Sequence, residues 1–509
     1  MNGDDSGDEN SLKGFYSYKN TFEDDAIWLD IPKNVTFINT TNPYLDPATP
    51  DLETMSVVQA RENQLLKNAA VACAAKALAR MQGCKPGGSR CQARTEVYPG
   101  SSSVDWKHKA AVYYDNAVSL LLQALKADTT MTPDDSDCEF RQHNGELVHP
   151  AKRRRTSSNA SSKSNTDEVL AATVILGAYE FLDTSMSEWA KHLSGAKSLL
   201  VHSHECSLPL QMQSPGSPLS TSSLNFISKA RRSAFWNIAR QDMYAAFINK
   251  SHTHLDTEDF SLWREAGLFI DDQGFLLSNS LLDSTYSGDG VICNSLIWLM
   301  SKLINFMAAG DKLPTDLGLS WAGIPQSTLL DSWYHLQKQF QAWHDSLPIT
   351  FQPSSRMEAT LAPGRLLHGE GEALFPEVWY NIPMCASTMQ AYHMSQILLF
   401  MNKPHEFTQG GRSTVCARLN SYQSVLAACQ KHSREIVGIS LAQQENAVRV
   451  YSVQALFTAG QCLGDPRERQ TVLDLIRDVE ADTGYATEYR ARQLTEQWQW
   501  EAQQAAFLA

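Results

Sequence analysis

Long blocks of apolar residues spaced three or four apart constrain this chain more than any other feature of its sequence. In the segment STLLDSWYHLQKQFQAWHDSLP, spanning 327–348, six apolar residues follow this spacing. At 3.6 residues per turn they lie on one face of a helix, and Pro348 ends the pattern. The stripe predicts a core-packing helix over 327–346 and needs no cofactor to explain its aromatic rings. The six residues are Leu329, Trp333, Leu336, Phe340, Trp343 and Leu347.

The same periodicity recurs along the chain, separated by segments that contain proline and glycine. Alternation of polar and apolar residues, typical of strands, is almost absent. The sequence therefore predicts an all-α fold, a large bundle or orthogonal array of about ten to twelve helices. The predicted helices cover 54–81, 105–126, 169–182, 187–200, 226–250, 290–309, 327–346, 379–402, 415–437, 444–463, 467–482 and 485–506.

The chain divides into an arm and a body by composition. Residues 1–53 are acidic and proline-bearing, which predicts an extended N-terminal arm. Residues 54–509 keep the helical pattern, which indicates one large domain although 509 residues are enough for two or three. Within the body, 128–166 and 207–223 are polar and rich in serine or proline, so we expect flexible loops there.

Charge and cysteine usage exclude several classes of protein. With 43 basic and 56 acidic residues the net charge is -13, which excludes a general nucleic-acid coat protein. The ten cysteines are spread singly, and the N-terminus MNGDDSGDEN lacks the apolar segment of a secretory signal. We therefore expect free thiols in a reducing compartment. The longest uncharged run, 378–402, is interrupted by polar residues, so we expect no membrane partner.

Candidates for catalysis and metal binding are weak in this sequence. Cys84 and Cys91 share a turn, but a zinc site needs four ligands. Asp134, Asp135 and Asp137 match the magnesium motif of terpene-synthase-like enzymes only superficially, because they lie in a polar loop. Phosphate-loop, dinucleotide and nucleophile-elbow motifs are absent. We predict no catalytic, metal or cofactor residues and keep a metal-dependent all-α enzyme as the least favoured alternative.

A basic tetrad stands alone in a serine-rich, otherwise acidic neighbourhood. It consists of Lys152, Arg153, Arg154 and Arg155. A short basic cluster on an exposed, flexible segment is the pattern of a nuclear-import signal, and a solvated charge cluster is the alternative. The run predicts localisation in the nucleus.

The segment RRSAFWNIARQDMYAAFINK, residues 231–250, contains the second candidate site. Its helical spacing places Asp242 in an apolar stripe, where a buried carboxylate needs a partner. Arg240 lies on another face, so we expect that partner to come from a different helix. A structural polar network is favoured over a polar contact in an effector pocket. The residues predicted to form this motif are Arg231, Phe235, Trp236, Arg240, Gln241 and Asp242.

At these residues the chain resembles the regulatory domain of fungal zinc-cluster transcription factors, the fungal-specific transcription factor domain. The matching stretches follow one another in order over most of the chain. They are FEDDAIWLDIPKNVTF (22–37), AATVILGAYEFLDTSMSEWAKHLSGAKSLL (171–200), ARRSAFWNIARQDMYAAFIN (230–249), SWYHLQKQFQAWHDSLPITFQP (332–353), PMCASTMQAYHMSQILLFMNKP (383–404), HSREIVGIS (432–440), VYSVQALFTAGQCLGDPRER (450–469) and LTEQWQW (494–500).

The resemblance implies transcriptional regulation in a fungal nucleus by an all-helical regulatory domain. Partners would be the transcription machinery or another regulator, with a homodimer and a small-molecule effector left open. The family's six-cysteine cluster, which holds two zinc ions and contacts DNA, has no counterpart here. DNA contact would then come from an upstream module or from a partner, and the alternative is a co-regulator or dominant-negative partner. We expect the walls of an effector pocket among Phe235–Phe247, Trp333–Trp343 and Tyr392–Phe400.

Overall fold

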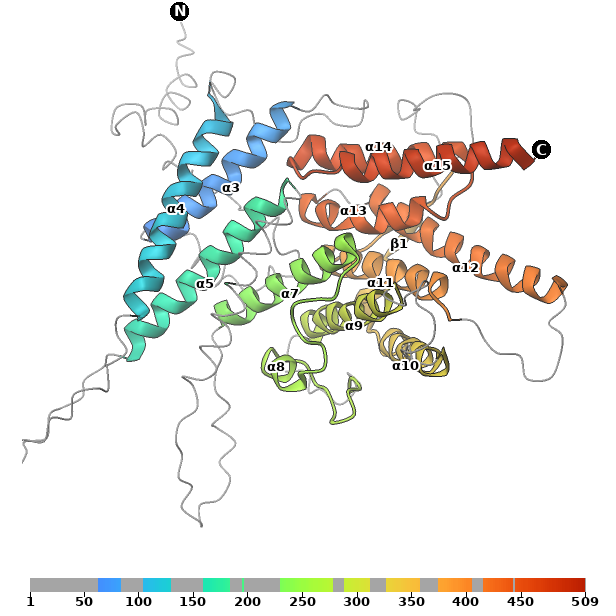
Figure 1. Cartoon of the computed structure of the whole chain (residues 1–509), viewed down its shortest axis with the longest axis horizontal. Helices are drawn as coiled ribbons and strands as arrows, with labels where there is room; N and C mark the ends of the chain where they lie inside the picture. The colour runs from blue at the N-terminus through green and yellow to red at the C-terminus, as the bar shows by residue number, and fades with distance from the viewer. Residues whose placement is uncertain are drawn as a thin grey trace, which may run out of the picture. The chain divides into compact units, whose positions relative to one another are not determined.

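The predicted all-α class is confirmed by a computed structural model of the chain (Figure 1). Residues 1–39 and 40–509 form separate units, and only the second contains described residues. The predicted arm (1–53), the basic tetrad 152–155 and the predicted loop 207–223 lie outside the described residues. The structure describes residues 63–83, 104–129, 159–183, 195, 229–277, 288–311, 326–357, 374–404, 415–442 and 445–508.

Three helices near the start of the described chain pack around a small core of their own. These are α3 (Gln64–Gly83), α4 (Trp106–Thr129) and α5 (Asn159–Phe181), drawn in blue to green in Figure 1. Their core is made of leucine, valine and alanine, because these helices present small apolar faces that approach closely. Its buried residues are Leu65, Leu66, Ala69, Ala117, Leu121, Val169, Ala172 and Leu176.

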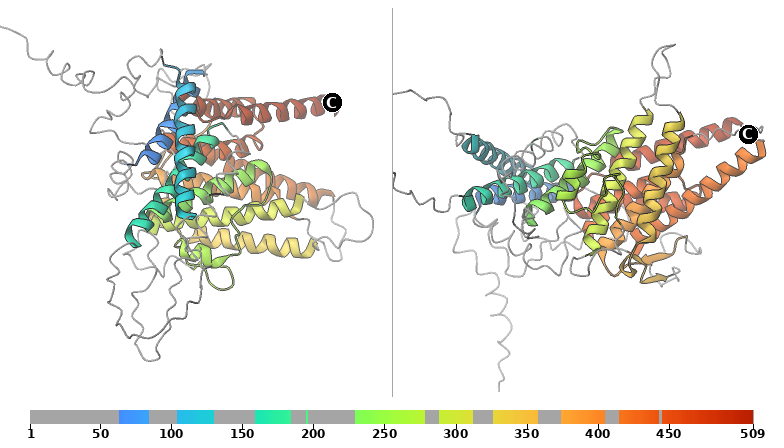
Figure 2. Two further views of the ribbon diagram at one scale, coloured as in Figure 1. Left: turned by 60° about the vertical axis from the view of Figure 1, so that its left-hand side comes forward. Right: turned by 90° about the horizontal axis from the view of Figure 1, so that it is seen from below.

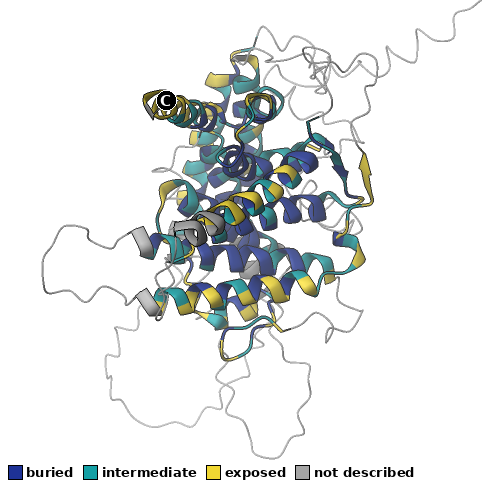
Figure 3. Cartoon of the chain, turned by 90° about the vertical axis from the view of Figure 1, so that its right-hand side faces the viewer, coloured by how far each residue is buried: buried dark blue, intermediate teal, exposed yellow. Residues whose placement is uncertain are grey.

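The remaining helices form a larger core, whose buried residues are dark blue in Figure 3 and whose helices are seen from two further sides in Figure 2. Within it, α11 is enclosed by its neighbours. From Met384 to Leu399 every residue of α11 except His393 is buried. Helices α9, α12 and α13 and the short 3-10 helix η5 (Ile349–Phe351) contact it. The helices of this group are α7 (Lys229–Asn249), α8 (Phe260–Glu265), α9 (Gly288–Asp311), α10 (Gln326–Asp345), α11 (Pro383–Met401), α12 (Val415–Ala442), α13 (Asn446–Gly460), α14 (Pro466–Thr483) and α15 (Glu488–Leu508).

The predicted aromatic stripe of α10 faces the core. Its four middle residues, Trp333, Leu336, Phe340 and Trp343, are buried, as the spacing indicates. The Trp333 indole nitrogen donates to the Leu399 carbonyl of α11 at 2.8 Å. The core-packing interpretation of this helix is therefore confirmed.

Several boundaries differ from the prediction. Helix α5 begins at Asn159, whereas the sequence predicts a loop until residue 166, because serine, asparagine and lysine extend a helix at only a small cost in propensity. Before α3, the Asn63 side chain accepts hydrogen bonds from the Leu65 and Leu66 amides and so caps the helix. The short helix α8 and the antiparallel pair β1 (Ser355–Met357) and β2 (Glu377–Trp379) were not predicted.

Gly484 lies at the contact between the small group of helices and the larger group. It ends α14 in a left-handed conformation with φ 72°, which favours glycine. A Cβ atom here would lie 2.5 Å from the Ala77 carbonyl oxygen of α3. The Arg80 guanidinium donates to the Gly484 carbonyl and forms an ion pair with Glu480 at 2.7 Å. Backbone and charge contacts thus join α3 to α14.

Helix α9 is apolar enough to satisfy the length and hydropathy criteria for a membrane span. The stretch meeting these criteria is 288–309, and 67% of its most apolar window is buried inside the protein. Buried side chains such as Leu296, Trp298 and Leu303 belong to the large core. Its hydropathy therefore reflects its place in the core of this fold.

Five of the cysteines have side chains that the structure describes, and all five are free. Cys293, Cys385, Cys429 and Cys462 are buried, and Cys73 is partly buried. Burial raises the pKa of the Cys385 thiol to about 12, so it stays protonated and behaves as a small apolar side chain. This agrees with the free thiols expected from the sequence.

A histidine pair joins α11 to α12. The Nδ1 atoms of His393 and His432 lie 2.8 Å apart, so one neutral ring donates to the other. Burial lowers the pKa of His432 from 6.5 to about 4. Burial also lowers the pKa of His393 well below its usual value, and the neighbouring His432 adds to this effect. The pair is therefore neutral near pH 7.

We predict that this pair makes the fold sensitive to acid. Between about pH 6.5 and 4 the unfolded histidine binds a proton that the folded one does not, so stability falls as pH falls. Replacing His432→Phe should remove about 1–2 kcal/mol of the acid-induced loss, allowing for partial solvent screening. Urea unfolding at pH 7 and pH 4.5 measures it. The exposed His108→Gln serves as control, and an unchanged pH slope in His432→Phe would contradict the prediction.

Candidate functional site

All six residues of the predicted motif lie on helix α7, and their side chains contact different neighbouring elements. Phe235, Trp236, Arg240 and Asp242 are buried, and Arg231 and Gln241 are partly buried. The helix contacts α5 on one side and α9 on another (Figure 1). The motif is therefore part of a packed helix rather than a surface patch.

The Asp242 carboxylate is 1% exposed and accepts hydrogen bonds from the loop that follows its own helix. Its Oδ1 accepts from the His254 amide at 2.9 Å, and its Oδ2 accepts from the Leu255 amide at 2.8 Å. The His254 ring nitrogen Nδ1 lies 3.0 Å from Oδ1. The expectation of a partner from a different helix is therefore wrong: backbone amides a dozen residues later in the chain satisfy the charge.

The loop fixed by Asp242 is also held by α8 and α9. Asn305 of α9 accepts from the Thr253 amide at 2.8 Å and donates to the Thr253 hydroxyl at 3.0 Å. The Trp298 indole of α9 donates to the Thr257 carbonyl at 3.1 Å, and the Trp263 indole of α8 donates to the Asp256 carbonyl at 2.8 Å. The loop residues 251–259 thus have their backbone groups tied to three helices, which makes this segment a rigid connection.

The aromatic members of the motif pack with α8. Phe235, Trp236 and Trp263 form a cluster with ring centroids 5.3–5.7 Å apart. The Trp236 indole donates to the Ala266 carbonyl at 3.0 Å. Such edge-on and tilted packing with the polar nitrogen satisfied is the arrangement of a structural core.

The two arginines of the motif connect α7 to other helices. Arg231 forms an ion pair with Asp167 of α5 at 3.1 Å. Arg240 is 1% exposed and lies 5.1 Å from the centroid of the Tyr451 ring of α13, a cation–π contact. Tyr244 stacks on the same Tyr451 ring with centroids 6.0 Å apart. Helix α7 therefore contacts both the small group of helices and α13.

A second buried arginine was not found from the sequence. Arg490 of α15 lies over the Phe457 ring of α13 at 3.9 Å and 5.5 Å from the Phe247 ring of α7. Its Nε donates to the Gln454 side chain at 2.9 Å, and burial lowers its pKa. Its sequence context, YRARQLTEQW, shows a polar helix with few large apolar residues, so no local signal marks the position as buried.

The structure places the three predicted pocket walls in two different environments, one beside a cavity and two in the large core. A cavity of about 180 Å³ is bordered by residues of α9 and α10 and by the segment 268–277. The wall Trp333–Trp343 contributes Gln339, Ala342 and Trp343 to it. Phe235–Phe247 and Tyr392–Phe400 pack into the large core instead. The segment 268–277 was missed, although the turn residues DDQG between apolar pairs are a recognisable hairpin signal.

Metal binding has no geometric support in the part of the chain that the structure describes. There, no three histidine, cysteine, aspartate or glutamate side chains come close enough to hold an ion. His254, which alternates with His252, is engaged by Asp242. Cys84, Cys91 and the acidic run 134–137 lie outside the described residues.

We predict that Asp242→Asn destabilises the protein. The amide offers one oxygen to three donors and turns its NH₂ group toward a backbone amide, which should lower the free energy of unfolding by about 1–3 kcal/mol. Urea unfolding measures the change. Asp272→Asn removes a carboxylate that is 98% exposed and should change stability by less than about 0.5 kcal/mol. Equal stability of both variants would show that the Asp242 contacts contribute nothing.

Comparison with known proteins agrees with this helical architecture. Residues 39–505 match the fungal specific transcription factor domain. Transcription activator AMTR1 of Alternaria alternata is 40% identical over 680 residues, which cover 98% of this chain and 88% of the activator. No solved structure matches the chain. The chain belongs to the family of fungal specific transcription factor domains.

Proposed function

We propose that this fungal transcriptional regulator activates transcription, and that it acts in the nucleus by binding rather than by catalysis. The observation that carries the proposal is the likeness to a transcription activator over nearly the whole chain. The described core supports it, because the polar groups of the α7 motif make structural contacts instead of facing a reaction site. Its partners would be the transcription machinery and other regulators.

The proposed mechanism is a change between conformational states of the helical body. A ligand or partner that binds one state more tightly shifts the population toward it. Helix α7 is the element best placed to couple the two groups of helices, since Arg231 reaches α5 and Arg240 reaches α13. The first turn and the middle of one helix therefore contact elements that would move relative to each other.

We further propose that DNA contact is supplied by a module outside this sequence or by a partner protein. The family's contact module uses six cysteines to hold two zinc ions, and this sequence contains no C-x-x-C pair. No three of the described cysteines come together and four of them are buried in the core, so they do not fit a two-zinc cluster. No step of the proposed mechanism passes through zinc in this chain.

Activation is tested by tethering the full chain to an unrelated DNA-binding domain upstream of a reporter gene in a fungal host. We expect reporter expression well above that of the DNA-binding domain alone. Asp242→Asn should lower expression, because it loosens the loop between α7 and α8, whereas Asp272→Asn should match the wild type. Protein levels measured by immunoblot serve as control. Unchanged or reduced expression with the wild-type chain would contradict activation.

Nuclear import is tested by replacing Lys152, Arg153, Arg154 and Arg155 with alanine in a fluorescent fusion. Removing the basic tetrad should move the fusion from the nucleus to the cytoplasm, since import receptors recognise exposed basic clusters. The control removes four exposed charges elsewhere, Lys107, Lys431, Arg467 and Arg492, and should stay nuclear. A tetrad variant that remains nuclear would show that import does not depend on this run.

A further inference from the structure

Three sulfur atoms from three parts of the chain meet in the larger group of helices. Met401 is the last residue of α11, Cys429 lies within α12, and Cys462 follows the end of α13. The Cys462 Sγ lies 3.9 Å from the Met401 Sδ. The thiols of Cys429 and Cys462 are hydrogen-bonded to each other. The fold therefore brings two thiols into contact that lie far apart in the sequence.

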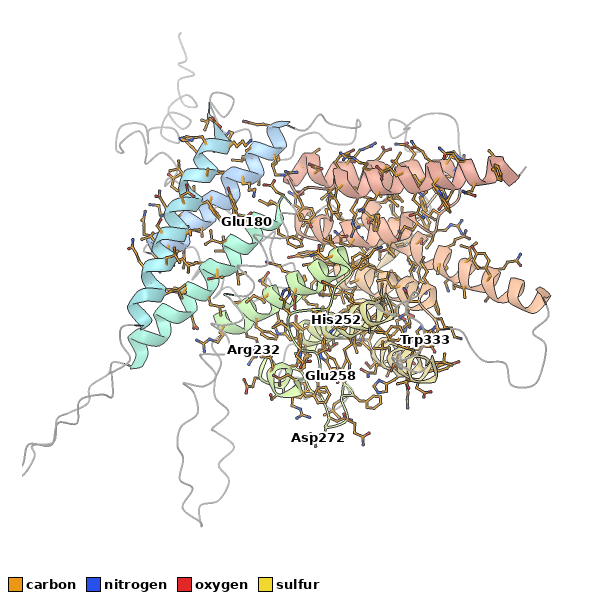
Figure 4. The ribbon with its side chains drawn as sticks, viewed as in Figure 1. Glu180, Arg232, His252, Glu258, Asp272 and Trp333 are labelled. Carbon is orange, nitrogen blue, oxygen red and sulfur yellow. The ribbon has the colours of Figure 1, made fainter. Side chains whose placement is uncertain are left out.

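The backbone that carries these sulfur atoms is fixed by its own hydrogen bonds. Trp333 of α10, labelled in Figure 4, donates to the Leu399 carbonyl at 2.8 Å and so holds the last turn of α11, which carries Met401. The Cys462 amide donates to the Ala459 carbonyl at 3.0 Å, directly after α13. The sulfur contacts thus belong to the packed fold.

Two other buried thiols contact hydroxyl groups instead. The Cys293 thiol of α9 is hydrogen-bonded to Thr388, and the Cys385 thiol of α11 is hydrogen-bonded to Thr350. Burial raises the pKa of both thiols, and these cysteines are only 1% and 0% exposed. Thiols that are protonated and closed off from solvent are inert, so this pair serves as an internal reference.

The hydrogen bond between Cys429 and Cys462 gives the two thiols different chemical roles. It lowers the pKa of Cys429, because the Cys462 thiol donates to the Cys429 sulfur, and it raises the pKa of Cys462. The thiolate is the nucleophilic form of cysteine. Cys429 is therefore suited to attack an electrophile, and Cys462 is suited to remain the protonated partner beside it.

The pair lies closer to solvent than the two reference thiols. Cys462 is 8% exposed, and Met401, which contacts it, is 53% exposed. Cys429 is 1% exposed, so only a small reagent reaches its sulfur. Methionine is flexible and leaves room by changing rotamer. Hydrogen peroxide is small enough to enter past Met401, whereas a bulky disulfide is not.

We propose that Cys429 and Cys462 form a reversible disulfide when the protein meets hydrogen peroxide. The Cys429 thiolate attacks one peroxide oxygen, the O–O bond breaks, and hydroxide leaves as Cys429 becomes a sulfenic acid. The Cys462 sulfur then attacks the sulfenic sulfur, the S–O bond breaks, and water leaves as the S–S bond forms. Overall, two thiols and one hydrogen peroxide give one disulfide and two water molecules. A thiol reductant reverses the step by disulfide exchange.

The disulfide ties α12 to the end of α13, and both helices contact α11. In a reducing compartment such a bond is transient and serves redox sensing rather than permanent structure. Its formation does not depend on the proposed function. Its effect on expression rests on that function, because only a transcriptional regulator turns the crosslink into a change of transcription.

The test uses the purified, reduced full chain treated with hydrogen peroxide. Free thiols are then blocked with N-ethylmaleimide, and a non-reducing digest is analysed by mass spectrometry. We expect peptides linked through Cys429 and Cys462, which dithiothreitol separates, while Cys293 and Cys385 stay reduced. Circular dichroism confirms that the treated protein keeps its fold. Absence of the link, a link of either cysteine mainly to another one, or equally fast linking of Cys293 to Cys385 would overturn the proposal.

Single variants separate the roles of the two thiols. In Cys462→Ser the sulfenic acid on Cys429 has no resolving thiol, so dimedone should label Cys429. In Cys429→Ser, Cys462 should stay unlabelled. Cys293→Ser is the matched control and should still form the Cys429–Cys462 link. Cooperative unfolding checks each fold, and if a variant does not fold, the linked peptides of the wild type decide alone. Labelling of Cys462 in place of Cys429 would overturn the assigned roles.

The outcomes separate this disulfide from the proposed function. The Cys429–Cys462 link together with an inactive reporter contradicts activation and leaves the disulfide standing. An active reporter without the link contradicts the disulfide and leaves activation standing. If both hold, a peroxide pulse should change reporter expression in the wild type more than in Cys429→Ser. An equal response of the two would overturn a regulatory effect of the disulfide.

Discussion

The near-complete burial of α11 is the constraint on which the larger group of helices depends. A helix whose side chains are buried on every side must be enclosed by other elements, and here α9, α12, α13 and η5 enclose α11. Helix α10 joins them through the Trp333 hydrogen bond to Leu399 and the stacking of Trp343 on Tyr392, with centroids 5.5 Å apart. Segments from 288 to 460 are thereby brought around one element, and the cavity lies at the edge of this arrangement, where α10 and α9 meet the hairpin.

Two buried charged groups of this protein, Asp242 and Arg490, are compensated by contacts within the chain. Asp242 has two backbone amides and a histidine ring as partners, and Arg490 has two glutamines and three aromatic rings. Each side chain thus compensates for its loss of water by contacts within the protein. The side-chain oxygens of Gln339 and Gln390 differ, because they have no hydrogen-bond partner among the described residues, and an unmade hydrogen bond at a buried acceptor costs about 1–3 kcal/mol. Such atoms occur in the enclosed helix α11 as well as beside the cavity, so they do not by themselves mark a binding site.

Much of the helical architecture follows from local patterns. The stripe from Leu329 to Leu347 and the stop at Pro348 predict α10 to within one residue at each end, because side-chain spacing and proline act over a single turn. The start of α5 was missed, since weak helix formers between 159 and 166 carry no local signal. The partner of Asp242 was also missed. Periodicity shows that a charge faces the core, but it does not show which loop returns to that face.

The cavity beside α10 shows the same contrast between features that local spacing predicts and features that depend on long-range packing. The aromatic spacing of Trp333–Trp343 identified one wall, but the hairpin and α9 complete the cavity, and their meeting depends on long-range packing. The sequence by itself determined the helical class, most helix boundaries and the burial of Asp242, since these arise from interactions within one or two turns. Only the tertiary structure decided that the His254 and Leu255 amides satisfy Asp242, and that Arg490 lies among the aromatic rings of Phe247 and Phe457. Those outcomes depend on where distant backbone segments lie, which no local spacing encodes.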